Sequence, residues 1–215
     1  MTGISPTELP RVFELSLTRA DTTAKEIEEL CRKAREQKLY GICVATSRVE
    51  LAASLLEDSD LKVTAFIGWP LGSADGDVKR YETEVAVDFG AQEFEVALNV
   101  GRLKDGDHKM VLRELRDVAE AADERIVKVA LRPQMLTTEE LRAACELIAE
   151  SGAHFVCLRT LASPIIDEVK LCREAVGAKF GIKAGDETLS TQAAVALLEA
   201  GANRLDVSNW IFPLS

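Results

Sequence analysis

Residues 93–99 read EFEVALN, a short run in which apolar and polar side chains alternate. In a β-strand, side chains two residues apart share a face. One face is then apolar from Phe94 to Leu98, and the other presents the carboxylate of Glu95 and the amide of Asn99. A strand inside an ordinary parallel sheet is covered by helices on both sides and is apolar on both. One polar face instead fits a closed barrel, where one side meets the helices and the other lines the interior.

The rest of the chain alternates short apolar runs with amphipathic segments. Strands are expected over eight runs: Val12–Leu17, Tyr40–Ala45, Lys62–Ile67, Glu93–Val100, Ile126–Leu131, His154–Leu158, Phe180–Ala184 and Asn203–Val207. Between them, Ala24–Gln37 and Thr138–Glu150 carry apolar residues at i, i+3, i+4 and i+7, the spacing of an amphipathic helix. Strands and helices in this order indicate a parallel sheet built from βα units.

The alternation predicts one α/β domain over residues 1–215, a (β/α)8 TIM barrel. An open doubly wound sheet is the alternative, but the sequence has no glycine-rich nucleotide-binding loop to favour it. The chain ends at Ser215, soon after the last expected strand, so the last helix is expected to be reduced or missing. Trp210–Leu214 would then form an apolar surface that another subunit could cover, which would favour a homo-oligomer.

The composition argues against several classes of protein. The net charge of −10 does not suit nucleic-acid binding, which calls for clustered Lys and Arg. No apolar run is long enough to cross a membrane, and the N-terminus lacks the layout of a signal peptide. The five cysteines are dispersed without a C-x-x-C motif, so a disulfide framework is not expected and a reducing cytoplasm is the expected location. With two histidines only, no metal site and no cofactor are expected.

The polar faces of the strands bring acids and bases into one interior. Glu14 in the first expected strand, Lys128 in the fifth and Lys183 in the seventh interrupt the apolar pattern as Glu95 does in the fourth. In a closed barrel these four side chains would converge inside. Burying charges is costly even when they are paired, so such a cluster is more typical of a functional site than of a scaffold. A structural ion-pair network is the alternative.

Ordered stretches of the chain resemble the deoxyribose-phosphate aldolase family, class I aldolases built on the (β/α)8 barrel. The most specific are IGWPLG at residues 67–72 and LNVGRLKDGD at residues 98–107. The resemblance continues in FELSLTRADTT (13–23), VKVALRPQMLTTEEL (127–141), SGAHFVCLRT (151–160), GIKAGDETLS (181–190) and AGANRLDVSN (200–209). It implies an aldolase, a lyase that makes and breaks carbon–carbon bonds through a Schiff base.

The catalytic residues that this resemblance implies carry over unevenly. The family's imine-forming lysine lies in the sixth strand, in a phrase like F-V-K-T-S, and that place is Cys157 here. Lys183 and Lys128 stand where the family has lysines in the seventh and fifth strands. The family's proton-transfer aspartate corresponds to Glu95, and its first-strand aspartate to Glu14, each longer by one methylene.

The end of the barrel that grips the substrate phosphate in the family differs further. The resemblance implies glycines at Asp186 and Glu187 and a small residue at Asp206. These carboxylates would repel a phosphate unless Arg159 or Arg132 compensates, so a small non-phosphorylated carbonyl compound or sugar-like substrate is expected. The residues expected to bind it are Arg159, Thr160, Ser16, Asn99 and Ser208. Arg159 could instead simply pair with Glu95.

A cysteine cannot form a Schiff base, so three alternatives stay open. Lys183 or Lys128 could form the imine, with Glu95 as general acid and base. Cys157 could act as a nucleophile if Lys183 and Arg159 stabilise its thiolate. The barrel could also bind a small ligand or partner without catalysis.

Overall fold

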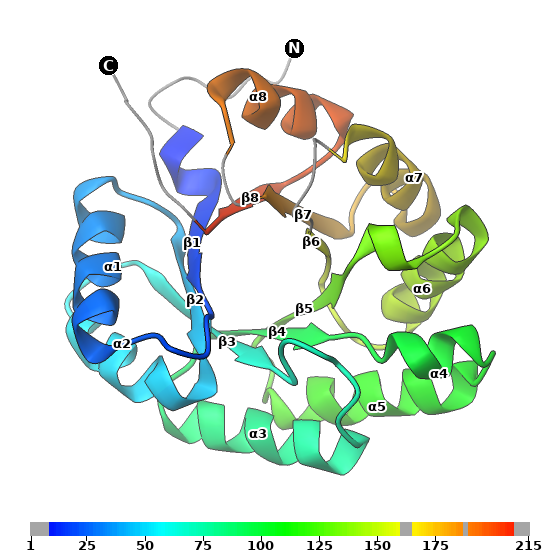
Figure 1. Cartoon of the computed structure of the whole chain (residues 1–215), viewed down its shortest axis with the longest axis horizontal. Coiled ribbons are helices and arrows are strands. Elements are labelled where there is room, and N and C mark those ends of the chain that lie inside the picture. Colours follow the sequence, from blue (N-terminus) through cyan, green and yellow to red (C-terminus); the bar gives the residue numbers. More distant parts are fainter. Residues whose placement is uncertain (1–8, 160–164, 187–188, 209–215) are drawn as a thin grey trace.

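The computed structural model describes residues 9–159, 165–186 and 189–208, and its strands form a closed parallel barrel (Figure 1). Each strand pairs with the next in the sequence, and β8 returns to pair with β1. The strands are β1 (Phe13–Leu17), β2 (Gly41–Ala45), β3 (Lys62–Ile67), β4 (Glu93–Ala97), β5 (Ile126–Leu131), β6 (Phe155–Arg159), β7 (Gly181–Asp186) and β8 (Arg204–Val207). The predicted barrel is confirmed, and the doubly wound alternative is wrong.

Helices surround the strands as a ring (Figure 1). They are α1 (Ala24–Glu36), α2 (Val49–Leu56), α3 (Gly76–Asp88), α4 (Val100–Lys104), α5 (His108–Ala121), α6 (Thr138–Glu150), α7 (Ile166–Val176) and α8 (Thr191–Ala200). The two helices named from their periodicity are confirmed, and each begins with a capping box, at Thr23 and at Thr137. The prediction of a reduced or missing last helix and of an apolar surface at Trp210–Leu214 concerns residues after 208, which lie outside the described ones.

Some strand ends differ from the predicted ones. The fourth strand ends at Ala97 rather than at Val100, because the side chain of Asn99 accepts a hydrogen bond from the backbone N–H of Arg102 and caps α4. The sixth strand extends to Arg159, which places that side chain in the interior together with Cys157.

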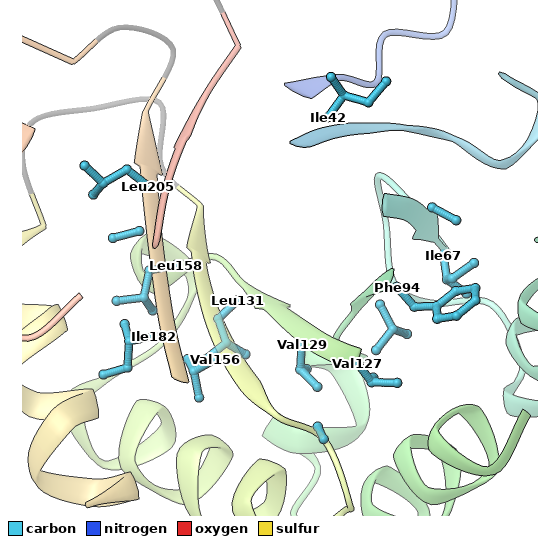
Figure 2. Packing of buried hydrophobic residues seen from close by; sticks show 14 of the residues in the cluster. Ile42, Ile67, Phe94, Val127, Val129, Leu131, Val156, Leu158, Ile182 and Leu205 are labelled. Atoms are coloured by element: carbon cyan, nitrogen blue, oxygen red, sulfur yellow. The ribbon is translucent and has the colours of Figure 1, made fainter. Parts of the chain in front are cut away.

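The apolar core lies between the strands and the helices. Alternate residues of each strand point outward, and Figure 2 shows Val129, Val156 and Ile182 on the side of the barrel that faces the helices. All three are fully buried. The opposite faces of the same strands are left free to carry polar side chains, as the alternation predicts. Within the described ranges, no helix combines the length and apolar character needed to cross a membrane.

Gly181 leaves space for an aromatic ring on the neighbouring strand, and this generates a test of the register. A Cβ at this position would lie 2.4–2.5 Å from three ring atoms of Phe155. We expect Gly181→Ala to lower the free energy of unfolding by about 1–3 kcal/mol, because the ring has to move. Gly101→Ala in α4 is the control, since its nearest contact would be an ordinary 3.6 Å and alanine favours a helix. Equal urea-unfolding free energies for the two variants would contradict the register.

Candidate active site

The barrel interior holds the four charged side chains that the sequence pattern places there. Glu14 comes from β1, Glu95 from β4, Lys128 from β5 and Lys183 from β7. None of them is more than 1% exposed. They therefore interact in a low-dielectric environment, where the state of each charge depends on its partners.

Lys183 is the centre of this interior. Its Nζ lies 2.6 Å from Glu14, 2.8 Å from Glu95 and 3.1 Å from Asp206. Burial by itself would lower the pKa of Lys183, but the carboxylates of Asp206, Glu14 and Glu95 outweigh it and raise the pKa well above its ordinary value. The side chain is therefore an ammonium at neutral pH, with three carboxylate partners.

Lys128 lies nearer the N-terminal ends of the strands. Its Nζ contacts Glu14, lies 2.7 Å from Glu93 and is 3.1 Å from the hydroxyl of Thr64. Burial lowers the pKa of Lys128, and Glu14 and Glu93 more than compensate, so the net shift is upward. Lys128 is thus also a cation, held between two carboxylates.

Arg204 closes the interior at that same end. Its guanidinium lies 2.8 Å from Glu93 and donates a 2.6 Å hydrogen bond to the hydroxyl of Tyr40. It also lies over the rings of Tyr40 and Phe155, with 3.8 and 4.6 Å to the centroids. Sequence reasoning missed Glu93, Arg204 and Tyr40 as parts of the network, although Glu93 shares the interior face with Glu95.

Arg159 covers the other end of the interior. It pairs with Glu95, its Nη1 lies 2.9 Å from Asp206, and its Nη2 donates to the hydroxyl of Ser16 at 3.2 Å. The guanidinium also lies 4.6 Å from the ring centroid of Phe66. The pairing with Glu95 left open by the sequence is therefore present, and it leaves Arg159 only 11% exposed.

Asp206 lies inside the barrel, where its carboxylate is buried and paired. Ser16 donates a 2.5 Å hydrogen bond to its carboxylate, which also binds Lys183 and Arg159. Space for it comes from Gly185, where a Cβ would lie 2.5 Å from that of Asp206. The alternation of side chains along β8 could have predicted this position. Leu205 faces the apolar core, so the next residue, Asp206, faces the interior of the barrel.

The same fold and chain length recur in known aldolases. The chain is 40% identical over 205 residues to deoxyribose-phosphate aldolase 1 of Bacillus licheniformis, covering 94% of this chain and 92% of that protein. It is 40% identical over 204 residues to the deoxyribose-phosphate aldolase of Exiguobacterium sibiricum, covering 93% and 92%. The chain belongs to the deoxyribose-phosphate aldolase family. No family model matches it.

Solved structures of aldolases share the architecture of this family member. The aldolase QR15 superposes with a TM-score of 0.87 at 29% identity, over 97% of this chain and 92% of the other. The tetrameric deoxyribose phosphate aldolase of Aeropyrum pernix gives a TM-score of 0.84 at 22% identity, over 95% and 88%, and shows the fold alone.

Cys157 is a buried thiol in this member of the aldolase family. It lies in register with Lys183 and Ala130, packs with Cys43, Phe66, Ala97 and Ala130, and is 1% exposed. Burial, with Glu95 nearby, raises the pKa of Cys157 well above its ordinary value despite the neighbouring cations. The thiol is therefore neutral at physiological pH, which does not favour its use as a nucleophile.

The remaining expected substrate-binding residues are dispersed. Ser16 lies in the interior, whereas Asn99 caps α4 and Ser208 is exposed just beyond β8. Thr160, Glu187 and the side chain of Asp186 lie outside what the structure describes. Among the side chains that are described, no group of three His, Cys, Asp or Glu is arranged to hold a metal ion.

Two hollows at the C-terminal ends of the strands share Trp69 as a wall. One is lined also by Arg132 and Arg159, and the other by Thr46 and Arg48. The Trp69 ring stacks on Phe66 with 4.4 Å between centroids, and Arg132 lies 4.8 Å from its centroid. Trp69 therefore lies between the surface of the mouth and the interior charges.

The paired carboxylates generate a pH prediction. Burial raises the pKa of Glu14, but Lys128, Lys183 and Arg204 lower it further, from 4.5 to about 2. Since the folded pKa lies below the unfolded one, this group stabilises the fold above about pH 4.5, and the contribution is lost as the pH falls toward about 2. We expect the urea-unfolding free energy to fall by about 3 kcal/mol over this window for Glu14 alone.

Glu14→Gln should remove this part of the pH dependence of the unfolding free energy. Glu29→Gln, which breaks exposed ion pairs of α1, is the control and should retain it, because surface pairs contribute little. An unchanged acid dependence in Glu14→Gln would contradict the assignment.

Proposed function

We propose that this chain is an aldolase-type carbon–carbon lyase that acts on a small, non-phosphorylated carbonyl compound, with Lys183 as the imine-forming amine. The observation that carries the proposal is the register of β6 and β7, in which Lys183 is the direct neighbour of Cys157. An amine is thus available one strand away from the place where the family has its own. Glu95, the counterpart of the family's proton-transfer residue, lies 2.8 Å from that amine.

Lys183 suits this role better than Lys128 does. Lys128 is level with Phe155 in the register of the barrel, whereas Lys183 is level with Cys157, two residues nearer the C-terminal ends of the strands. Active sites of (β/α)8 barrels lie at that end. Lys128 would then influence the reaction indirectly, because it binds Glu14, which also binds Lys183.

The chemistry follows from these neighbours. The neutral amine of Lys183 would attack the carbonyl carbon, and the carbonyl oxygen would leave as water. The bond between the carbons α and β to the iminium carbon would break: its electron pair would form the double bond of an enamine, and the iminium π pair would pass to nitrogen. Glu95 would take the hydroxyl proton of the departing carbonyl compound, directly or through a water. Protonation of the enamine and hydrolysis of the imine would return Lys183.

The preference for a non-phosphorylated substrate rests on the charges at the mouth. Arg159, the cation that could have received a phosphate, is already bound by Glu95 and Asp206. Arg132 donates to the backbone oxygen of Pro70 and lies over Trp69. An uncharged carbonyl compound would displace fewer of these contacts than a dianion.

By analogy with the tetrameric relative from Aeropyrum pernix, we also propose a homo-oligomer.

A binding protein without catalysis is the second candidate. The observation that favours it is the raised pKa of Lys183, because an ammonium cannot attack a carbonyl. In the lyase, entry of the substrate has to displace a carboxylate from Lys183 and so release its proton. In the binding protein the ion pairs would stay in place.

Reductive trapping tests the lyase. We expect borohydride with acetaldehyde to leave a reduced adduct on Lys183, located by peptide mass spectrometry. Its rate should increase with pH through the alkaline range, because only the neutral amine reacts and the pKa of Lys183 is raised. Asp206→Gly removes one carboxylate partner and should speed trapping at neutral pH by lowering that pKa.

Matched variants identify the reacting amine. Lys183→Met should abolish the interior adduct, whereas Lys170→Met, which removes an exposed lysine of α7, should leave it unchanged. Trapping on neither Lys183 nor Lys128, across a panel of small aldehydes and ketones, would rule out the lyase. Thermal stabilisation by such a compound without an adduct would then favour the binding protein.

A further inference from the structure

A third buried lysine, Lys79, lies outside the interior of the barrel. Lys79 of α3 is fully buried, and its Nζ has three acceptors: the carboxylate of Glu114 at 2.6 Å, the backbone oxygen of Gly72 at 2.6 Å and that of Ala97 at 2.8 Å. A lysine ammonium has three donors, so this one is fully used. No step of the proposed reaction employs it.

These acceptors belong to three separate parts of the fold. Glu114 comes from α5, and Ala97 is the last residue of β4, two residues beyond Glu95. Gly72 ends the segment 68–72 that follows β3. The Lys79 ammonium therefore joins this segment to the strand that carries the proposed acid–base residue.

Lys79 contacts both ends of the segment 68–72. At one end it binds the Gly72 oxygen, and at the other a Cβ on Gly68 would lie 2.9 Å from its Cε. The backbone N–H of Gly72 donates to the oxygen of Gly68 at 2.9 Å, which closes the segment into a compact turn. Trp69, a residue shared by the two hollows at the mouth, thus lies between Gly72, whose oxygen Lys79 binds, and Gly68, which packs beside the Lys79 stem and donates its backbone N–H to Glu82 at 2.8 Å.

We propose that Lys79 is a positioning residue of the active-site mouth: its ammonium sets the place of Trp69 relative to β4 and so shapes the entrance to Arg159 and Lys183. Trp69 lies 5.7 Å from the guanidinium of Arg159 and stacks on Phe66, which Arg159 also covers. A shift of the segment would therefore move the aromatic surface on which Arg159 lies. The effect on substrate rests on the proposed function, whereas the effect on Trp69 does not.

The energetics of the pair fit a geometric role. Burial lowers the pKa of Lys79 against the attraction of Glu114, and burial raises the pKa of Glu114 against that of Lys79, so each group is on balance less readily charged than in water. Buried ion pairs of this kind often contribute little net stability compared with apolar side chains of similar size. The contact is then more readily explained by the placement of the two backbone segments than by stability.

Fluorescence of Trp69 tests the proposal without any substrate. In a Trp210→Phe background, Trp69 is the sole tryptophan of the sequence. We expect Lys79→Met/Glu114→Gln, which removes the ammonium without leaving a buried carboxylate unpaired, to shift Trp69 emission to longer wavelength and to increase its quenching by acrylamide. Glu114→Gln alone keeps both backbone contacts of Lys79 and should shift the emission less.

A variant that is destabilised at another place in the fold serves as a control. It distinguishes a specific displacement of Trp69 from an effect of lower stability. Gly181→Ala lies on β7 at the Phe155 contact, and in the same background it should leave the emission of Trp69 unchanged. If Lys79→Met/Glu114→Gln does not fold, Lys79→Gln replaces it, since a neutral amide reaches fewer of the three acceptors and should still shift the emission. A folded Lys79 variant with unchanged emission and quenching overturns the proposal.

Trapping of acetaldehyde on Lys183 supplies the functional readout. The folded Lys79 variant should react more slowly, by up to about 10²-fold, as misplacement by about 1 Å can cause. If wild type forms no adduct on Lys183, the assignment of Lys183 as the imine-forming amine fails, and the fluorescence result alone still decides the role of Lys79. An altered emission together with an unchanged trapping rate would overturn the claim that this segment shapes access to Lys183.

Discussion

The ammonium of Lys183, enclosed by the carboxylates of Glu14, Glu95 and Asp206, is the contact on which the rest of the interior depends. Each of these carboxylates has a second cationic partner, so the ion pairs form one continuous network. Its described members are four acids and four bases: Glu14, Glu93, Glu95 and Asp206 with Lys128, Lys183, Arg159 and Arg204. Removing a single member would leave a buried charge uncompensated, which typically costs about 3–5 kcal/mol.

This balance explains why the departures from the family pattern occur together. On the resemblance described above, Cys157 corresponds to the family's imine-forming lysine, and a thiol there supplies no cation to the interior. Arg159, two residues further along the same strand, supplies one, and it binds Glu95 and Asp206. Asp206 in turn is accommodated by Gly185. Cys157, Arg159, Asp206 and Gly185 are therefore linked through charge and space, and the proposed move of the amine by one strand would leave Glu95 in contact with it.

The sequence predicts the fold and the members of the interior better than their pairing. The period-two pattern of EFEVALN and its counterparts identifies which face of each strand is inward, because an apolar outer face has to meet helices. It cannot tell which carboxylate a given lysine reaches, because that depends on stagger across the barrel and on side-chain length. Asn99 continues the polar face in the sequence yet caps α4, since a local hydrogen bond competed with strand extension. Asp206 was placed by analogy with a phosphate site, although its alternation with Leu205 indicates the interior.

The central claim is that the acid–base residues of an aldolase remain competent in this barrel although the usual imine position is a thiol. The most direct test is Cys157→Lys/Arg159→Ser, which adds one cation, removes one, and so keeps four bases against four acids. The account predicts that the introduced lysine, beside the cation of Lys183, has a lowered pKa, is trapped by acetaldehyde and borohydride, and cleaves unphosphorylated deoxyribose. A folded double variant that forms no adduct on the introduced lysine and shows no cleavage would contradict it.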